Sequence, residues 1–275
     1  MNNKNKRMYM ENEKILKTES GEIHYWIFGD IDCNKRTLFF LHGLTANHKL
    51  FDNQTDYFSK EYNVISWDAP AHGKSRPFEN FTYEKAAFAA KEILEENGIE
   101  KAVFIGQSMG GFITQSVLKR FPEIVEGFVS IDSCPYGEKY YSKSDKWWLR
   151  QIEWMSKLYP DKILRKSVAK QVSTTEGAYL NMLDMHEDYD KKELCRLLGT
   201  GYACFLDDVS NLQIKCPTLL IVGDKDVTGK VIKYNKEWSE DLGCEISWIK
   251  NAAHNSNYDR PEEVNSEIEK FLKTF

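Results

Sequence analysis

The segment Val103–Ile113, VFIGQSMGGFI, places Ser108 on a turn between a strand pattern and a helix pattern. An apolar run leads into Gly106, and the helical pattern after Ser108 starts with Gly110 close behind. Small residues on both sides allow a sharp strand-to-helix turn that lifts a serine Oγ out of the end of a sheet. A plain turn can contain the same residues, but the strand before and the helix after favour a nucleophilic serine.

A serine hydroxyl is a poor nucleophile at neutral pH, so the chain should also supply a base and a group that orients that base. Histidine suits the role of base because its ordinary pKa is about 6.5. Of the six histidines, His254 is the one in a loop after the last predicted strand. Three aspartates at the ends of strand patterns could orient its imidazole, namely Asp132, Asp224 and Asp226.

The elements that must position these side chains alternate between short apolar runs and helical patterns. Strands are predicted over residues 22–29, 37–43, 63–70, 101–106, 124–132, 217–224 and 245–250. Helices are predicted over residues 48–62, 82–98, 109–122, 229–243 and 261–275, with Thr82 as a cap and Gly98 as a stop. This alternation predicts an α/β fold with a mostly parallel twisted sheet flanked by helices.

The alternation stops after Asp132 and resumes near residue 215. Between these points only helical patterns occur, over residues 144–160, 160–173, 174–187 and 190–206. Residues 173–176 and 190–193 resemble the capping boxes that start helices. We therefore expect a core formed by residues 1–133 and 215–275, with an all-helical insert over 134–214.

Composition and charge narrow the possible partners. The net charge of −5 and the lack of a basic block argue against a nucleic-acid partner. The six cysteines form no C-x-x-C pair and no metal-ligand spacing, so neither a metal nor a disulfide framework is expected. No phosphate-binding glycine loop, apolar leader or membrane-length apolar run occurs. We expect a cytoplasmic protein with no cofactor and no membrane span; the sequence leaves its oligomeric state open.

Taken together, the motifs resemble the α/β-hydrolase family, in particular its esterase- and lipase-like members with a serine nucleophile and a helical cap. The resemblance covers nearly the whole chain except the insert. Ala253 stands before His254 where the family often has glycine. Five stretches occur in the family's order: LHG at 41–43, DAPAHGKS at 68–75, GQSMGG at 106–111, LLIVGDKD at 219–226 and NAAHNSNYDRPEEV at 251–264.

The resemblance implies a catalytic triad of Ser108, Asp226 and His254, and it favours Asp226 over the other two aspartates. It also implies an oxyanion hole formed by the backbone N–H groups of Leu44 and Met109. The implied activity is hydrolysis of small to medium, fairly apolar carboxylic esters through an acyl-enzyme. A thioester, lactone, amide or vinylogous diketone substrate is the alternative, followed by a non-catalytic receptor that only binds such ligands.

Overall fold

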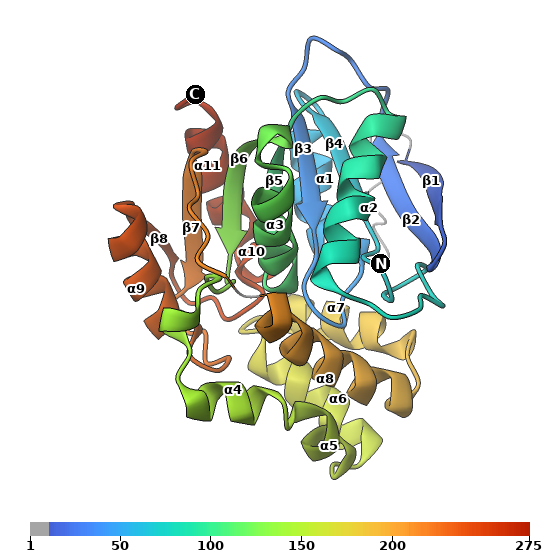
Figure 1. Cartoon of the computed structure of the whole chain (residues 1–275), viewed down its shortest axis with the longest axis vertical. Helices are drawn as coiled ribbons and strands as arrows, with labels where there is room; N and C mark the ends of the chain where they lie inside the picture. The colour runs from blue at the N-terminus through green and yellow to red at the C-terminus, as the bar shows by residue number, and fades with distance from the viewer. Residues whose placement is uncertain (1–10, 209) are drawn as a thin grey trace.

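An eight-stranded sheet runs through the part of the chain that the computed structural model describes, residues 11–208 and 210–275 (Figure 1). The strand order is β1-β2-β4-β3-β5-β6-β7-β8. β2 pairs antiparallel with β1 and β4, and the other neighbours are parallel. The predicted fold class is confirmed. The strands are β1 (Glu11–Thr18), β2 (Gly21–Phe28), β3 (Thr37–Leu41), β4 (Asn63–Trp67), β5 (Ala102–Gln107), β6 (Val125–Ile131), β7 (Thr218–Gly223) and β8 (Ile246–Ile249).

The central strands are apolar on both faces because helices cover both faces. Successive side chains of a strand point to opposite faces, so Phe39 and Phe104 belong to one core cluster. Their neighbours Leu38 and Phe40 belong to the cluster on the other face. This explains why β3 and β5 read in the sequence as mainly apolar runs rather than as alternating ones.

Two helical layers enclose the sheet (Figure 1). Apolar residues of α2, α3 and α9 pack into the first cluster, and those of α1 and α11 pack into the second. The Thr82 side chain accepts a hydrogen bond from the Lys85 N–H at the start of α2, as its predicted cap role requires. The helices of this part are α1 (Asp52–Phe58), α2 (Tyr83–Glu96), α3 (Met109–Arg120), α9 (Val231–Leu242), α10 (Ser256–Asp259) and α11 (Pro261–Leu272), with 3-10 turns at His48–Phe51 and Pro122–Ile124.

The chain between β6 and β7 is helical and forms the lower part of the molecule in Figure 1. It lies over the loop that follows β3. Gly201 packs so closely on Leu44 of that loop that a Cβ added to the glycine would come within 2.4 Å of the Leu44 side chain. A hydrogen bond of 3.1 Å also joins His186 Nε2 to Thr45 Oγ1. Its helices are α4 (Lys143–Leu149), α5 (Ile152–Lys157), α6 (Asp161–Gln171), α7 (Glu176–Glu187) and α8 (Lys191–Asp208), preceded by a 3-10 turn at Glu138–Tyr140.

The sequence patterns do not predict β1, which lies at the edge of the sheet opposite to β8. Its sequence, ENEKILKT, is mostly polar; Leu16 is buried while the neighbouring Ile15 is 44% exposed. An edge strand that pairs on one side only buries few side chains, so it carries a weak apolar signal. Charged residues on such a strand also discourage pairing with other chains.

The insert departs from the predicted helices at two places. The helix predicted over 144–160 is two helices, α4 and α5, with a break between Leu149 and Ile152. The capping box predicted at Ser173 is wrong by two residues, because Thr175 caps α7 by accepting the Ala178 N–H. The capping box predicted at residues 190–193 is confirmed by reciprocal hydrogen bonds of 2.7 and 3.1 Å.

Candidate active site

Ser108 stands between the last residue of β5 and the first residue of α3, with a φ of 49° and a ψ of −112°. A positive φ is uncommon for a residue with a side chain, and such strain persists only where the surroundings enforce it. A Cβ on Gly106 would lie 2.4 Å from the Gly110 carbonyl carbon. A Cβ on Gly110 would lie 1.9 Å from the Leu41 carbonyl oxygen. Glycine is therefore required at both positions for the sharp turn that presents Oγ.

His254 and Asp226 form a hydrogen-bonded chain with Ser108. His254 Nε2 lies 2.8 Å from Ser108 Oγ, and His254 Nδ1 lies 2.8 Å from Asp226 Oδ2. The carboxylate can only accept, so Nδ1 carries a proton and Nε2 is free to accept one from Oγ. Both His254 and Asp226 are buried. The structure therefore brings together three of the predicted site residues in an arrangement suited to general-base activation of a hydroxyl.

Burial and charge act in opposite directions on His254. Burial alone would lower the pKa of its imidazole, but the Asp226 carboxylate, with a smaller contribution from Asp132, raises that pKa above its ordinary value. A base with a raised pKa binds a transferred proton more strongly than an ordinary imidazole does.

Asp132 lies next to this chain but bonds to backbone rather than to the imidazole. Its Oδ1 accepts the Gly223 N–H at 2.7 Å, and its Oδ2 accepts the Ser256 N–H at 3.0 Å. Burial, together with the nearby charge of Asp226, raises the pKa of Asp132 to about 7. The side chain thus ties the end of β7 to the loop that carries His254.

Asp224, the third aspartate considered from the sequence, is also not placed on the imidazole. Its carboxylate lies 3.7 Å from the ammonium of Lys225, and its backbone N–H bonds to the Ile249 carbonyl. Of the three aspartates, Asp226 is the one whose oxygen contacts His254.

The loop after β3 is held by His42. Its Nε2 accepts the Ala69 N–H at 2.9 Å, so its Nδ1 carries the proton and donates to the Gly43 carbonyl at 2.7 Å. Burial lowers the pKa of His42 to about 4, which keeps this neutral tautomer at physiological pH. The carbonyl of Gly43 and the N–H of Leu44 belong to one trans peptide and point in opposite directions.

The N–H groups of Leu44 and Met109 are the two predicted oxyanion donors. Met109 is the first residue of α3, where a backbone N–H has no acceptor within its own helix. Within residues 11–208 and 210–275, neither N–H has a protein acceptor. The loop passes directly beside the serine, since an ideal Cβ on Gly43 would lie 3.3 Å from Ser108 Cβ.

Two positioning residues were missing from the sequence prediction. Asp259 accepts the Ala253 N–H at 2.9 Å, and its other hydrogen bonds come from Thr174 and Thr175 at the start of α7. Gln107 donates to the His254 carbonyl at 2.7 Å. Both residues lie in stretches singled out from the sequence, Gln107 in GQSMGG and Asp259 in NAAHNSNYDRPEEV, but neither stretch shows which group its side chain would hold.

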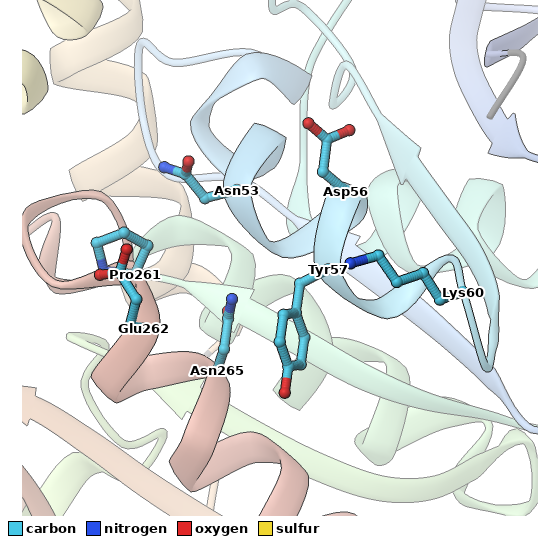
Figure 2. A pocket seen from close by; sticks show the side chains of 7 residues that line it. All are labelled: Asn53, Asp56, Tyr57, Lys60, Pro261, Glu262 and Asn265. Atoms are coloured by element: carbon cyan, nitrogen blue, oxygen red, sulfur yellow. The ribbon is translucent and has the colours of Figure 1, made fainter. Parts of the chain in front are cut away.

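A surface hollow of about 250 Å³ lies elsewhere on the molecule (Figure 2). Its walls are mainly polar side chains of α1 and α11, with Lys60 two residues beyond the end of α1, and neither Ser108 nor His254 lines it. It is therefore distinct from the candidate active site. The lining residues are Asn53, Asp56, Tyr57, Lys60, Pro261, Glu262 and Asn265.

Two other features are missing among the residues that the structure describes. In the part of the chain that the structure describes, no three His, Cys, Asp or Glu side chains are grouped so that they could hold a metal ion. Among these same residues, no helix combines the length and the apolar character needed to cross a bilayer.

Comparison with known proteins agrees with the fold. Residues 36–168 match the family model for the alpha/beta hydrolase fold. The AB hydrolase superfamily protein YisY of Bacillus subtilis is 26% identical over 93% of this chain and 97% of its own. The 3-oxoadipate enol-lactonase 1 of Acinetobacter baylyi is 22% identical over 88% of this chain and 90% of its own.

A solved structure of a thermophilic esterase matches with a TM-score of 0.76 and 23% identity, covering 96% of this chain and 98% of that one. This chain has the α/β-hydrolase fold, and its residues 36–168 match that family's model. Its similarity to esterases and lactonases supports a hydrolase.

Proposed function

We propose that this protein is a serine hydrolase that cleaves carboxylic esters through an acyl-enzyme intermediate. The observation that carries the proposal is the chain of two 2.8 Å hydrogen bonds from Ser108 Oγ through His254 to Asp226. A serine whose Oγ faces an unprotonated imidazole nitrogen, on a turn that exposes it, has the arrangement that acyl transfer requires.

In the first half of the reaction, Ser108 Oγ attacks the ester carbonyl carbon while its proton passes to His254 Nε2. The carbonyl oxygen becomes an oxyanion, and the N–H groups of Leu44 and Met109 stabilise it. When the tetrahedral intermediate collapses, the bond to the alkoxy group breaks and His254 gives its proton to the departing alcohol. Asp226 stays ionised and stabilises the imidazolium that forms between these two steps.

In the second half, a water molecule takes the place of the alcohol. His254 removes one proton from the water, and the resulting hydroxide attacks the acyl carbon. Collapse of the second tetrahedral intermediate returns the proton to Ser108 Oγ and releases the acid. Across the two halves, one ester and one water molecule give one acid and one alcohol.

We further propose that residues 134–214 form a cap that shapes the substrate pocket, with residues 1–133 and 215–275 as the catalytic core. The packing of Gly201 on Leu44 and the hydrogen bond between His186 and Thr45 support this division, because both put insert residues on the proposed oxyanion loop. Large apolar side chains in the insert favour small to medium, fairly apolar substrates.

A lactone is the second candidate substrate. The relative from Acinetobacter baylyi is named an enol-lactonase, and a lactone is an internal ester that the same groups can open. In that case the alcohol formed stays attached to the acyl group, so no separate product leaves after the first half-reaction.

The six cysteines, all of which lie in the described residues and are free, fit a protein of a reducing compartment, and we propose the cytoplasm.

The decisive experiment compares wild-type protein with Ser108→Ala on p-nitrophenyl esters of increasing acyl length, on a lactone panel, and with a fluorophosphonate probe. Wild type should be labelled and should turn over esters; Ser108→Ala should lose labelling and about 10⁵–10⁶ of kcat. Ser167→Ala, which changes an exposed serine of α6, is the matched control and should behave as wild type. Turnover that survives in pure Ser108→Ala protein would refute the assignment, and labelling without ester turnover would direct attention to lactones, thioesters or amides.

A further inference from the structure

The insert exposes a group of large apolar side chains that the proposed chemistry does not use. The described residues include thirteen strongly exposed large hydrophobic side chains, and six of these lie between positions 147 and 163. Their exposed fractions run from 50% for Trp154 to 72% for Leu158. We call them the cap patch: Trp147, Trp148, Trp154, Leu158, Tyr159 and Ile163.

The cap patch covers α4, α5 and the start of α6, which form the lower end of the molecule in Figure 1. No residue of α4 is buried, and in α5 only Ser156 is. Leu149 and Ile152 pack against the core, whereas the three tryptophans of these helices are at least half exposed. A large group of exposed apolar side chains usually marks a surface that binds a partner.

The same segment is basic within an acidic chain. Residues 143–170 contain eight Lys or Arg and three Asp or Glu, a net charge of +5, whereas the whole chain carries −5. Four of the lysines are exposed and form no ion pair within residues 11–208 and 210–275; they are Lys143, Lys162, Lys166 and Lys170. The segment that carries the tryptophans thus offers unpaired positive charge to a partner.

These two properties together fit an anionic lipid surface. Tryptophan and tyrosine favour the level of the lipid headgroups, and leucine and isoleucine can enter the acyl boundary below it. Lysine side chains place their ammonium groups among anionic headgroups while their stems remain in apolar surroundings. The patch also lies at an end of the molecule, and a fluid bilayer adapts to a projecting surface without needing a complementary groove.

A second copy of this chain fits the cap patch less well than an anionic lipid surface does. A symmetric dimer through the cap patch would bring two segments of charge +5 against each other, and the three carboxylates of each segment already form ion pairs within their own copy. An acidic protein would satisfy the charge, but it would have to cover three exposed tryptophans with a matching apolar surface.

We propose that α4, α5 and the start of α6 dock this protein on anionic lipid bilayers, with the cap patch inserted at the headgroup level and the unpaired lysines bound to lipid charge. The docking is peripheral and reversible. It places the insert, rather than the edge of the sheet, against the membrane.

The test is co-sedimentation of the full chain with vesicles of phosphatidylcholine alone, or of phosphatidylcholine mixed with phosphatidylglycerol. We expect binding to the anionic vesicles, weaker binding at high salt, and a blue shift of tryptophan fluorescence on binding. Combined Trp147→Ser, Trp148→Ser and Leu158→Ser should lower the partition coefficient at least about tenfold. Combined Lys162→Glu and Lys166→Glu should do the same, since each basic residue near such a surface contributes about fivefold.

The matched control is Trp248→Ser, which removes a tryptophan that is 41% exposed on β8, outside the insert. It should bind as wild type, and circular dichroism should report the same fold for every variant. Because Lys162 and Lys166 are exposed, the charge variant keeps the test valid if the apolar variant fails to fold. Absence of binding to anionic vesicles, equal binding to neutral vesicles, or binding that neither variant weakens would overturn the proposal. So would sedimentation velocity that shows self-association dependent on the cap patch in place of lipid binding.

Discussion

Replacing Asp226 with asparagine should change which nitrogen of His254 carries the proton. Asp226 Oδ1 accepts the Thr228 N–H at 2.7 Å, and Oδ2 accepts the proton on His254 Nδ1 at 2.8 Å. Both neighbours donate, so an amide cannot serve both. If the amide oxygen stays on Thr228, the NH₂ group faces Nδ1 and forces the imidazole proton onto Nε2. If the amide turns round, its NH₂ group meets the Thr228 N–H at hydrogen-bond distance without an acceptor.

The first arrangement keeps the Thr228 bond and is therefore expected. It leaves a protonated Nε2 facing Ser108 Oγ at 2.8 Å, where the nitrogen can no longer accept the serine proton. Loss of the working tautomer in a serine–histidine–acid site costs about 10⁴ in kcat. At about 1.4 kcal/mol for each factor of ten, this corresponds to roughly 5 kcal/mol of transition-state stabilisation.

Asp132→Asn is the matched control because it makes the same chemical change next to the same histidine. Asp132 accepts from Gly223 and Ser256 and bonds to neither nitrogen of His254, so the tautomer should persist. One buried N–H loses its acceptor, which should lower the free energy of unfolding by about 1–3 kcal/mol. Removal of a carboxyl group whose pKa is raised to about 7 by burial and by Asp226 should offset part of this loss. We expect kcat to stay within about tenfold of wild type.

The assay is kcat and kcat/KM for a p-nitrophenyl ester in wild type, Asp226→Asn and Asp132→Asn, with urea unfolding of each. Circular dichroism should show that Asp226→Asn is folded at the assay temperature. A larger loss of kcat in Asp132→Asn than in Asp226→Asn would refute the reasoning and make Asp132 the acid. A folded Asp226→Asn protein with a tenth of wild-type kcat would show that the tautomer argument fails.

Three further outcomes follow from the same geometry. Wild-type kcat/KM for a neutral ester should rise with pH in one step whose midpoint lies above about 6.5, because His254 must be unprotonated and its pKa is raised; a profile flat from about pH 5 to about pH 9 would exclude His254 as the base. Gly110→Ala should lower the free energy of unfolding in urea by roughly 1–3 kcal/mol or more, because the added Cβ would lie 1.9 Å from the Leu41 carbonyl oxygen. Gly177→Ala is the control; Gly177 has open space around it in α7, so its replacement should leave stability unchanged or raise it. Asp259→Asn should lower the free energy of unfolding by about 1–3 kcal/mol and should also lower kcat, because every group that bonds to the Asp259 carboxylate is a donor. An unchanged free energy of unfolding together with an unchanged kcat would refute the positioning role of Asp259.

The parts of the fold that the sequence predicted well are those with continuous apolar patterns. β3 and β5 are buried on both faces, so most of their residues carry the apolar signal. β1 lies at the sheet edge and buries little, and its charged sequence resembles that of a loop. The break between α4 and α5 leaves no mark either, since no glycine or proline stands between Leu149 and Ile152.

The start of α7 shows why a helix cap can be misplaced from sequence alone. Residues 173–176 offer a serine and two threonines, each of which can accept the hydrogen bond of a cap. The choice among them depends on Asp259, more than eighty positions away, whose carboxylate accepts the N–H groups of Thr174 and Thr175. A contact between such distant positions has no local pattern.

The choice among the three aspartates also depended on contacts between residues that are distant in the sequence. Sequence places Asp132, Asp224 and Asp226 at the ends of neighbouring strands, and all three have the same chemical group. What separates them is which donors each carboxylate receives. Asp132 has both oxygens occupied by backbone N–H groups, while Asp226 has one occupied by Thr228 and the other directed at the imidazole. The two buried carboxylates also repel each other, and this repulsion adds to the effect of burial in raising the pKa of Asp132. Only the folded arrangement separates the aspartate that joins the end of β7 to the histidine loop from the aspartate that orients the imidazole.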